Sequence, residues 1–221
     1  MFDNVWNTFN QDPFSTAVYL ESLEPYILSD QLTQLPTSIV QQFVAHYEAR
    51  NKLEGLEACL THFHVTCIDI HQAMSICQQH NLYDAIIYIY NNAMLDYITP
   101  VEKLLRLLSS ETEQSEAMII LGNKLLVYIS QCLAGRAYPY GDIPSDRVKQ
   151  AKYDVYSTIT LLSARNSDSD MSDVSYPHLH TLLKFDTQVS FKYDAVHKKG
   201  YIVGAFRVNN DRPKRGFFVL G

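Results

Sequence analysis

The sequence contains little glycine, proline or cysteine and no excess of basic residues, and each shortage excludes a class of protein. Its 221 residues include 8 Gly and 8 Pro, which is too few for a collagen-like or low-complexity chain. Four cysteines in a chain of this length do not make a disulfide framework, so we expect free thiols in a reducing compartment. The net charge is −6, from 18 Lys and Arg against 24 Asp and Glu, which argues against a protein that binds polyanions over its whole surface.

Segments that direct a chain to or across a membrane are also missing from the sequence. Residues 1–6 carry no positive charge ahead of an apolar run, which is unlike a signal peptide. The longest apolar stretch, residues 118–133, is interrupted by polar side chains and is expected to be too short to span a bilayer. Because 47% of the residues are hydrophobic, the chain is not intrinsically disordered. We therefore expect a soluble, intracellular, folded protein.

Charge is distributed unevenly along the chain. Residues 192–221 carry seven Lys and Arg against two Asp, a net of +5, which leaves −11 for the other 191 residues. Half of the glycines also fall in this last stretch. We therefore expect a helical body at 1–188 and a short, basic, poorly ordered tail at 189–221. The tail has at most one hairpin and no sheet to join, so it is not expected to form a domain.

Helix-start and helix-stop signals alternate with apolar stripes of three- to four-residue spacing along the body. Asp12 followed by Pro13 predicts a helix that opens there and is stopped by Pro25. Thr99, Pro100 and Glu102 have the spacing of a capping box. Helices are expected near 13–23, 36–51, 53–60, 69–80, 82–94, 99–110, 115–133, 145–162 and 176–185.

These elements predict an all-α fold, an irregular α-solenoid of stacked antiparallel helix pairs. The pairs near 36–60, 69–94 and 99–133 have unequal lengths and share no consensus, which excludes a regular 34-residue repeat. The helix at 82–94 is apolar nearly all round and is expected to be packed on both sides. Residues 163–175 are rich in Ser and Asp and are expected to form a mobile acidic loop, in which Ser167 has the spacing of an acidophilic kinase site.

Cysteine and histidine gather in one stretch, Cys59-x2-His62-x-His64-x2-Cys67. Zinc takes such ligands, so a small zinc-binding module or metal-dependent enzyme using these four residues is the alternative interpretation. The spacing differs from that of zinc-finger knuckles, and unpaired cysteines are commonly small core residues. The preferred interpretation is therefore core packing, with no metal, cofactor or catalytic residue assigned.

Other chemistries have even less support in the sequence. It contains no G-x-S-x-G elbow, Gly-rich phosphate loop or H-E-x-x-H motif. The 15 Tyr and 10 Phe have no basic groove beside them in the acidic body, so we expect them to pack the core and expect no nucleic-acid partner.

Several segments carry a resemblance to a known family. They are FHVTCIDIHQ (63–72), LYDAIIYIYN (82–91), DYITPVEKLL (96–105), GDIP (141–144) and YPHLHTLLKFD (176–186). These resemble the central region of the vacuolar protein sorting-associated protein 8 family, over most of residues 36–188. After Gln188 the resemblance stops, where charge and composition change.

The resemblance implies a subunit of the CORVET tethering complex, which acts with an early-endosomal Rab GTPase before membrane fusion. It therefore implies a non-enzymatic scaffold in endosome-to-vacuole or lysosome trafficking, cytoplasmic and peripheral on early and late endosomes. The implied partners are the other vacuolar-sorting tethering subunits. The family's full chain looks like a β-propeller, an α-solenoid and a RING-type zinc domain. Neither the propeller nor the RING cysteines occur here, so the Rab contact is expected outside this fragment.

Overall fold

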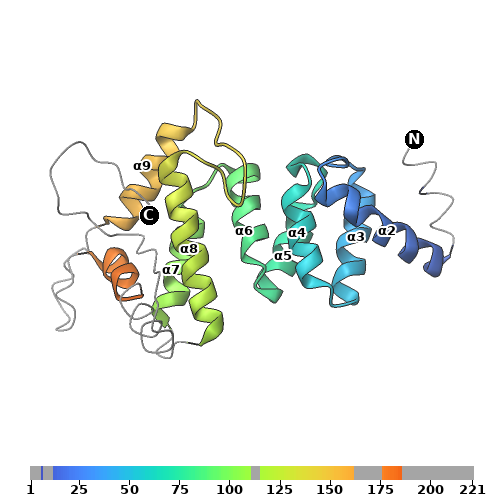
Figure 1. Cartoon of the computed structure of the whole chain (residues 1–221), viewed down its shortest axis with the longest axis horizontal. Coiled ribbons are helices and arrows are strands. Elements are labelled where there is room, and N and C mark those ends of the chain that lie inside the picture. The colour runs from blue at the N-terminus through green and yellow to red at the C-terminus, as the bar shows by residue number, and fades with distance from the viewer. Residues whose placement is uncertain (1–5, 7–11, 111–114, 162–175, 186–221) are drawn as a thin grey trace, which may run out of the picture. The chain divides into compact units, whose positions relative to one another are not determined.

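A computed structural model describes residue 6 and residues 12–110, 115–161 and 176–185 of the chain (Figure 1). Over these ranges the fold is all-α, as predicted, and the β-type pairing found there is an isolated bridge between Arg136 and Asp142. The chain divides into two compact units. Unit 1 comprises residues 1–96 and Tyr138–Tyr140, and unit 2 comprises residues 97–137 and 141–221.

Unit 1 is a set of short helices around one aromatic core. Helix α4 packs against α2, α3 and α6, and α5 packs against α3 and α6. In the core the Phe43 and Tyr47 rings stack at 4.1 Å, and Phe63 meets Phe43 edge-on at 5.7 Å. The elements are α2 (Pro13–Leu28), α3 (Thr37–Ala49), α4 (Leu53–His62), the 3-10 turn η1 (Val65–Cys67), α5 (Ile70–His80), α6 (Tyr83–Ile89) and the π-turn η2 (Tyr90–Met94).

Helix α2 corrects one prediction, because Pro25 lies inside the helix and does not end it. A proline in a helix removes one hydrogen bond and crowds the preceding turn, which costs about 3 kcal/mol. Ile27 continues the apolar stripe beyond the proline and is fully buried. Burial of such a side chain contributes about 1.5–3 kcal/mol, so the packing of the last turn offsets most of this cost.

Capping residues explain why α5 lies where the sequence placed it. The Asp69 carboxylate accepts a hydrogen bond from the Gln72 backbone N–H at 3.1 Å, and Asn81 ends the helix in the left-handed region, at φ 57°. The predicted helix at 82–94 also forms, although its last turn widens into η2. No cap or spacing in the sequence had indicated that π-turn.

Unit 2 contains α7 (Ile98–Ser110), α8 (Glu116–Ala134), α9 (Val148–Ile159) and a further helix at 177–185. Two predicted starts are wrong. Helix α7 begins at Ile98, so Thr99 lies in its first turn, and α9 begins at Val148 because Pro144 first forms a turn with Arg147 and Val148. The predicted helix at 176–185 is confirmed.

Helix α8 is long and apolar enough, by length and composition alone, to cross a membrane. The prediction that this stretch is too short is therefore wrong in length, since the helix has 19 residues. The core helix of a soluble protein passes the same test, and much of α8 packs against its neighbours. Its buried residues are Leu121, Gly122, Leu125, Leu126, Tyr128, Ile129 and Cys132.

The helix at 177–185 packs on the other three helices of unit 2. Phe185 lies over Gly122 of α8, so closely that a β-carbon at Gly122 would fall 2.1 Å from the ring. The His178 ring contacts the Thr158 carbonyl of α9 at 2.8 Å. The acidic loop at 163–175 and the tail at 189–221 lie outside the described residues, so the predictions made for them stay predictions.

Candidate functional site

The structure does not support the zinc alternative, because the four candidate ligands have other roles. Cys59 is fully buried in the core of unit 1, and Cys67 is buried at the end of η1. His62 Nδ1 lies 2.7 Å from the Asp30 carboxylate. His64 Nδ1 lies 2.7 Å from the Thr66 hydroxyl, a contact that closes the turn at η1. The two cysteines are therefore buried, and the two histidines contact different side chains, Asp30 and Thr66.

The thiol chemistry agrees with this. Burial raises the pKa of Cys59 to about 12, with a smaller contribution from the nearby Glu24 carboxylate. Zinc binds the thiolate, and such a pKa keeps the thiol protonated at neutral pH. Within the described ranges, no group of three or more His, Cys, Asp or Glu side chains is placed to hold a metal ion. The cysteines act as small core residues.

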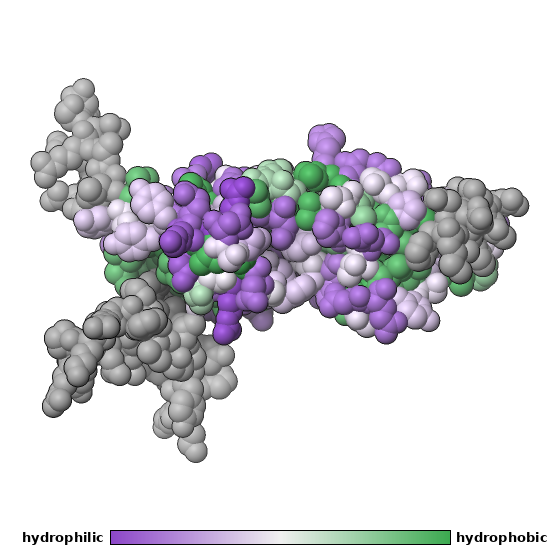
Figure 2. All heavy atoms as spheres, turned by 90° about the horizontal axis from the view of Figure 1, so that it is seen from above, coloured by the Kyte–Doolittle hydropathy of each residue, from purple (hydrophilic) through white to green (hydrophobic). Residues whose placement is uncertain are grey.

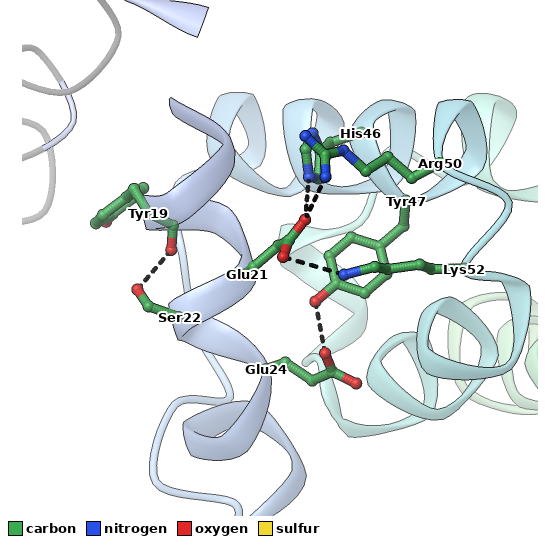
Figure 3. Close-up of polar contacts among 8 residues, drawn as sticks. All are labelled: Tyr19, Glu21, Ser22, Glu24, His46, Tyr47, Arg50 and Lys52. Carbon is green, nitrogen blue, oxygen red and sulfur yellow. Dashed lines mark hydrogen bonds and ion pairs between the residues drawn. The ribbon is translucent and has the colours of Figure 1, made fainter. Parts of the chain in front are cut away.

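A charged network joins α2 to α3 and to the turn that precedes α4 (Figure 3). Glu21 of α2 is contacted by one imidazole and two cations, His46 Nε2 at 3.1 Å, Arg50 Nη1 at 3.4 Å and Lys52 Nζ at 3.0 Å. The hydrogen bonds from Lys52 and His46 lower the pKa of Glu21, so the carboxylate stays charged near neutral pH. Arg50 and Lys52 are the two Lys or Arg residues of the sequence between 12 and 96, and both are held by this one carboxylate.

A surface hollow of about 570 Å³ lies beside this network. The buried Tyr47 hydroxyl donates to the Glu24 carboxylate at 2.8 Å (Figure 3). Burial, followed by that hydrogen bond, raises the pKa of Tyr47 well above its ordinary value, so the phenol is no nucleophile at neutral pH. The lining residues are Glu24, Tyr47, Asn51, Lys52, Leu53, Glu54 and Gly55. This set contains no histidine, cysteine or serine, and its lysine, Lys52, is paired with Glu21 at 3.0 Å.

The segment Tyr138–Tyr140 belongs to unit 1 although it lies far along the chain. The Tyr138 hydroxyl donates to Asp84 at 2.6 Å, and the Tyr140 hydroxyl donates to the Thr61 carbonyl. The Tyr140 ring also lies 4.9 Å from the His62 ring. This segment lies between the helices that the sequence predicted near 115–133 and 145–162. The Tyr-Pro-Tyr spacing was the available signal, and it gives no partner.

Apolar side chains remain exposed on several helices. Figure 2 shows green apolar patches between the polar ones, among them patches at the right-hand end, where α2 lies in Figure 1. On α2, Phe14 is 75% exposed and Val18 is 53% exposed. Helix α8 exposes Ile120 and Val127, and α9 exposes Tyr153. The sequence predicted a helix that opens at Pro13 but did not indicate which of its faces would be exposed.

The comparisons with known proteins agree with one another. A family model described as the Vps8 central TPR matches residues 18–193. The human vacuolar protein sorting-associated protein 8 homolog is 38% identical over 192 residues, which cover 85% of this chain and 13% of that protein. The Drosophila melanogaster homolog is 30% identical over 188 residues, 85% of this chain and 14% of that protein. The Saccharomyces cerevisiae protein is 25% identical over 76% of this chain and 14% of its own length. No solved structure matches.

Proposed function

This chain belongs to the Vps8 family, and on that premise we propose that it is a non-enzymatic scaffold segment of a CORVET-like endosomal tethering complex. It would act through protein–protein contacts in endosome-to-vacuole or lysosome trafficking and vesicle fusion. The observation that carries the proposal is the family match over residues 18–193. The chain spans 13–14% of the length of these curated relatives, so complex membership and partners are proposed for this chain rather than taken from them.

The side-chain chemistry supports a scaffold rather than an enzyme. In the part of the chain that the structure describes, the cysteines are buried. The Tyr47 and Tyr138 hydroxyls are bound to carboxylates of neighbouring helices. Burial and these bonds raise the pKa of both phenols. The thiols are therefore buried, and the two phenols bind neighbouring segments of the fold.

The proposed partners are the other vacuolar-sorting tethering subunits, and the proposed location is cytoplasmic and peripheral on early and late endosomes. Contact with the Rab GTPase pathway is proposed to lie outside this fragment. No nucleic-acid partner is proposed, because residues 12–96 carry ten acidic and two basic side chains and would repel a phosphate backbone.

Affinity purification of the tagged chain from cells tests this function. We expect vacuolar-sorting tethering subunits to be recovered in stoichiometric amounts, and the tagged chain to overlap with early-endosome markers. A tagged Tyr153→Phe chain is purified in parallel with the unsubstituted one. Because that side chain is 66% exposed, the loss of its hydroxyl should leave the recovered subunits unchanged. The proposal would be contradicted if none of these subunits were recovered although the chain kept its helical circular dichroism signal.

A further inference from the structure

Residues 138–140 lie in unit 1, although the residues on both sides of them belong to unit 2. Both tyrosines of this segment bind helices that are distant in the sequence. The Tyr138 side chain is buried, and its hydroxyl donates to the Asp84 carboxylate, in the first turn of α6, at 2.6 Å. The Tyr140 hydroxyl donates to the Thr61 carbonyl, in the last turn of α4. We name this segment, Tyr138–Tyr140, the tyrosine latch.

The part of unit 1 that the tyrosine latch covers is positioned by other contacts. The Asp84 backbone N–H donates to the Glu57 carboxylate at 2.7 Å, which fixes the start of α6 against α4. The His62 ring, 4.9 Å from the Tyr140 ring, is held by the Asp30 carboxylate at 2.7 Å. These contacts do not involve the latch, so we expect the surface to keep its shape without it. We name this surface the latch site; it consists of Thr61, His62 and Asp84.

Backbone hydrogen bonds beside the tyrosine latch close a hairpin within its own loop. The Ala137 N–H donates to the Gly141 carbonyl at 3.1 Å, and the Ile143 N–H donates to the Gly135 carbonyl at 3.4 Å. None of these four residues belongs to α4 or α6. Departure of the latch would therefore break side-chain contacts, the two hydroxyl bonds among them, and leave both backbone bonds of the hairpin intact.

The latch site offers two hydrogen-bond acceptors, a carbonyl and a carboxylate, and in this structure two phenol hydroxyls from one tight turn occupy them. A ligand that replaces the latch needs two donors at the same spacing, because a buried acceptor left without a donor is unfavourable. We propose that the latch site binds a tyrosine-bearing turn of a partner protein, Tyr-x-Tyr in sequence, and that the chain's own tyrosine latch occupies it until the partner displaces the latch. The inference goes beyond the proposed function, because it concerns a site of the isolated chain and does not depend on which complex the chain joins.

A cyclic, fluorescein-labelled peptide with the sequence of residues 135–143 is the probe, and its fluorescence anisotropy measures binding to the full 221-residue chain. In the unsubstituted chain the peptide competes with the latch, which lowers its apparent affinity by the fraction of open chains. We expect a Tyr138→Ala/Tyr140→Ala chain, whose latch site is empty, to bind the peptide about tenfold or more tightly than the unsubstituted chain. A Tyr153→Ala/Tyr156→Ala chain is the matched control, because these side chains are 66% and 60% exposed; it should bind like the unsubstituted chain.

Substitutions on the other side of the contact test the latch site itself. In the Tyr138→Ala/Tyr140→Ala chain, Asp84→Ala removes the acceptor of one phenol and should weaken peptide binding about tenfold or more. Asp154→Ala is its matched control, because that carboxylate accepts from Gln150 of α9; it should leave peptide binding unchanged. A second peptide, in which phenylalanine replaces both tyrosines, should also bind about tenfold or more weakly.

The proposal would be overturned if the Tyr138→Ala/Tyr140→Ala chain kept its helical circular dichroism signal but bound the peptide no better than the unsubstituted chain. Equal binding of the tyrosine and phenylalanine peptides would also overturn it, since that result indicates nonspecific apolar adhesion. If the alanine substitutions unfold the chain, Tyr138→Phe/Tyr140→Phe takes their place, because it keeps both rings and removes the hydroxyls. It should bind the peptide more tightly than the unsubstituted chain, and equal affinity would overturn the proposal. A dimer in sedimentation that either double substitution abolishes would identify a second copy as the ligand and overturn the assignment to a partner protein.

Discussion

A glycine-to-alanine exchange at the centre of α8 tests the packing of unit 2 directly. A β-carbon at Gly122 would lie 2.1, 2.4 and 2.5 Å from three carbons of the Phe185 ring, and carbon atoms that are not bonded pack no closer than about 3.5 Å. Phe185 is buried, so its ring has to move together with the helix at 177–185. The substitution therefore either strains this contact or displaces that helix.

Two opposing contributions decide whether Gly122→Ala raises or lowers the free energy of unfolding. Alanine is favoured over glycine in a helix interior by about 1 kcal/mol. Overpacking costs about 1–3 kcal/mol, and expulsion of the Phe185 side chain from its site costs about 1.5–3 kcal/mol. We therefore expect Gly122→Ala to lower the free energy of unfolding by about 1 kcal/mol, in spite of the better helix propensity.

Removing the Phe185 ring should reverse the effect of Gly122→Ala on the free energy of unfolding. In a Phe185→Ala background nothing opposes the new methyl group, so Gly122→Ala should raise the free energy of unfolding by about 1 kcal/mol. Urea unfolding followed by circular dichroism at the helical minimum measures all four proteins of this double-mutant cycle. Asn123→Ala is the control, because Asn123 is the exposed neighbour in the same helix and should not couple to Phe185. A stabilising Gly122→Ala in the wild-type background would refute the packing described here.

Four further predictions concern the buried chemistry and the tail. Tyr138→Phe should cost about 1.5–3 kcal/mol of stability, because it removes a hydrogen bond to a carboxylate, whereas Tyr153→Phe, at an exposed site, should leave the melting temperature unchanged. Since burial raises the pKa of Cys59 to about 12, its thiol stays protonated, and iodoacetamide labelling of Cys59 in the native chain, followed by peptide mass spectrometry, should not increase between pH 7 and 9. Ile86→Asp should lower stability by about 3 kcal/mol or more, because it places a charge among buried neighbours; an unchanged urea midpoint would contradict this. Limited trypsin digestion should cut the tail first, for example at Lys198, and leave a body that keeps its helical signal.

Sequence signals predicted helices well where a single residue ended or capped them. Asp69 and Asn81 act through hydrogen bonds and backbone geometry within a few residues, so α5 was found at both ends. The helix predicted near 145–162 instead begins late, at Val148, because the Pro144 carbonyl accepts from the backbone N–H groups of Arg147 and Val148 and forms a turn first. A cap is a local signal, and a competing turn next to it is decided by backbone geometry that the residue type alone does not fix.

The continuation of α2 past Pro25 and the contacts of Tyr138 could not be predicted for a different reason, which is contact between distant residues. Pro25 stays helical because Ile27 has a place in the core, and Tyr138 bonds Asp84 from 54 positions away. Neither partner can be identified from the neighbouring sequence. The exposed face of α2 is the same case, because apolar residues occur on more than one side of this helix and which side is buried depends on where α3 and α4 lie.

The fate of the polar side chains links the fold to a scaffold function. In the described part of the chain, Glu21 joins α2 to α3 through His46 and Arg50, and Glu24 joins the same helices through Tyr47. Asp84 joins α6 to the loop that contains Tyr138, and the described cysteines are buried. The exposed side of α2 includes the apolar side chains of Phe14 and Val18, and the hydroxyl of Ser22, which donates to the Tyr19 carbonyl of the same helix. Such a surface gains free energy only by leaving water, so its chemistry suits binding another protein rather than transforming a substrate.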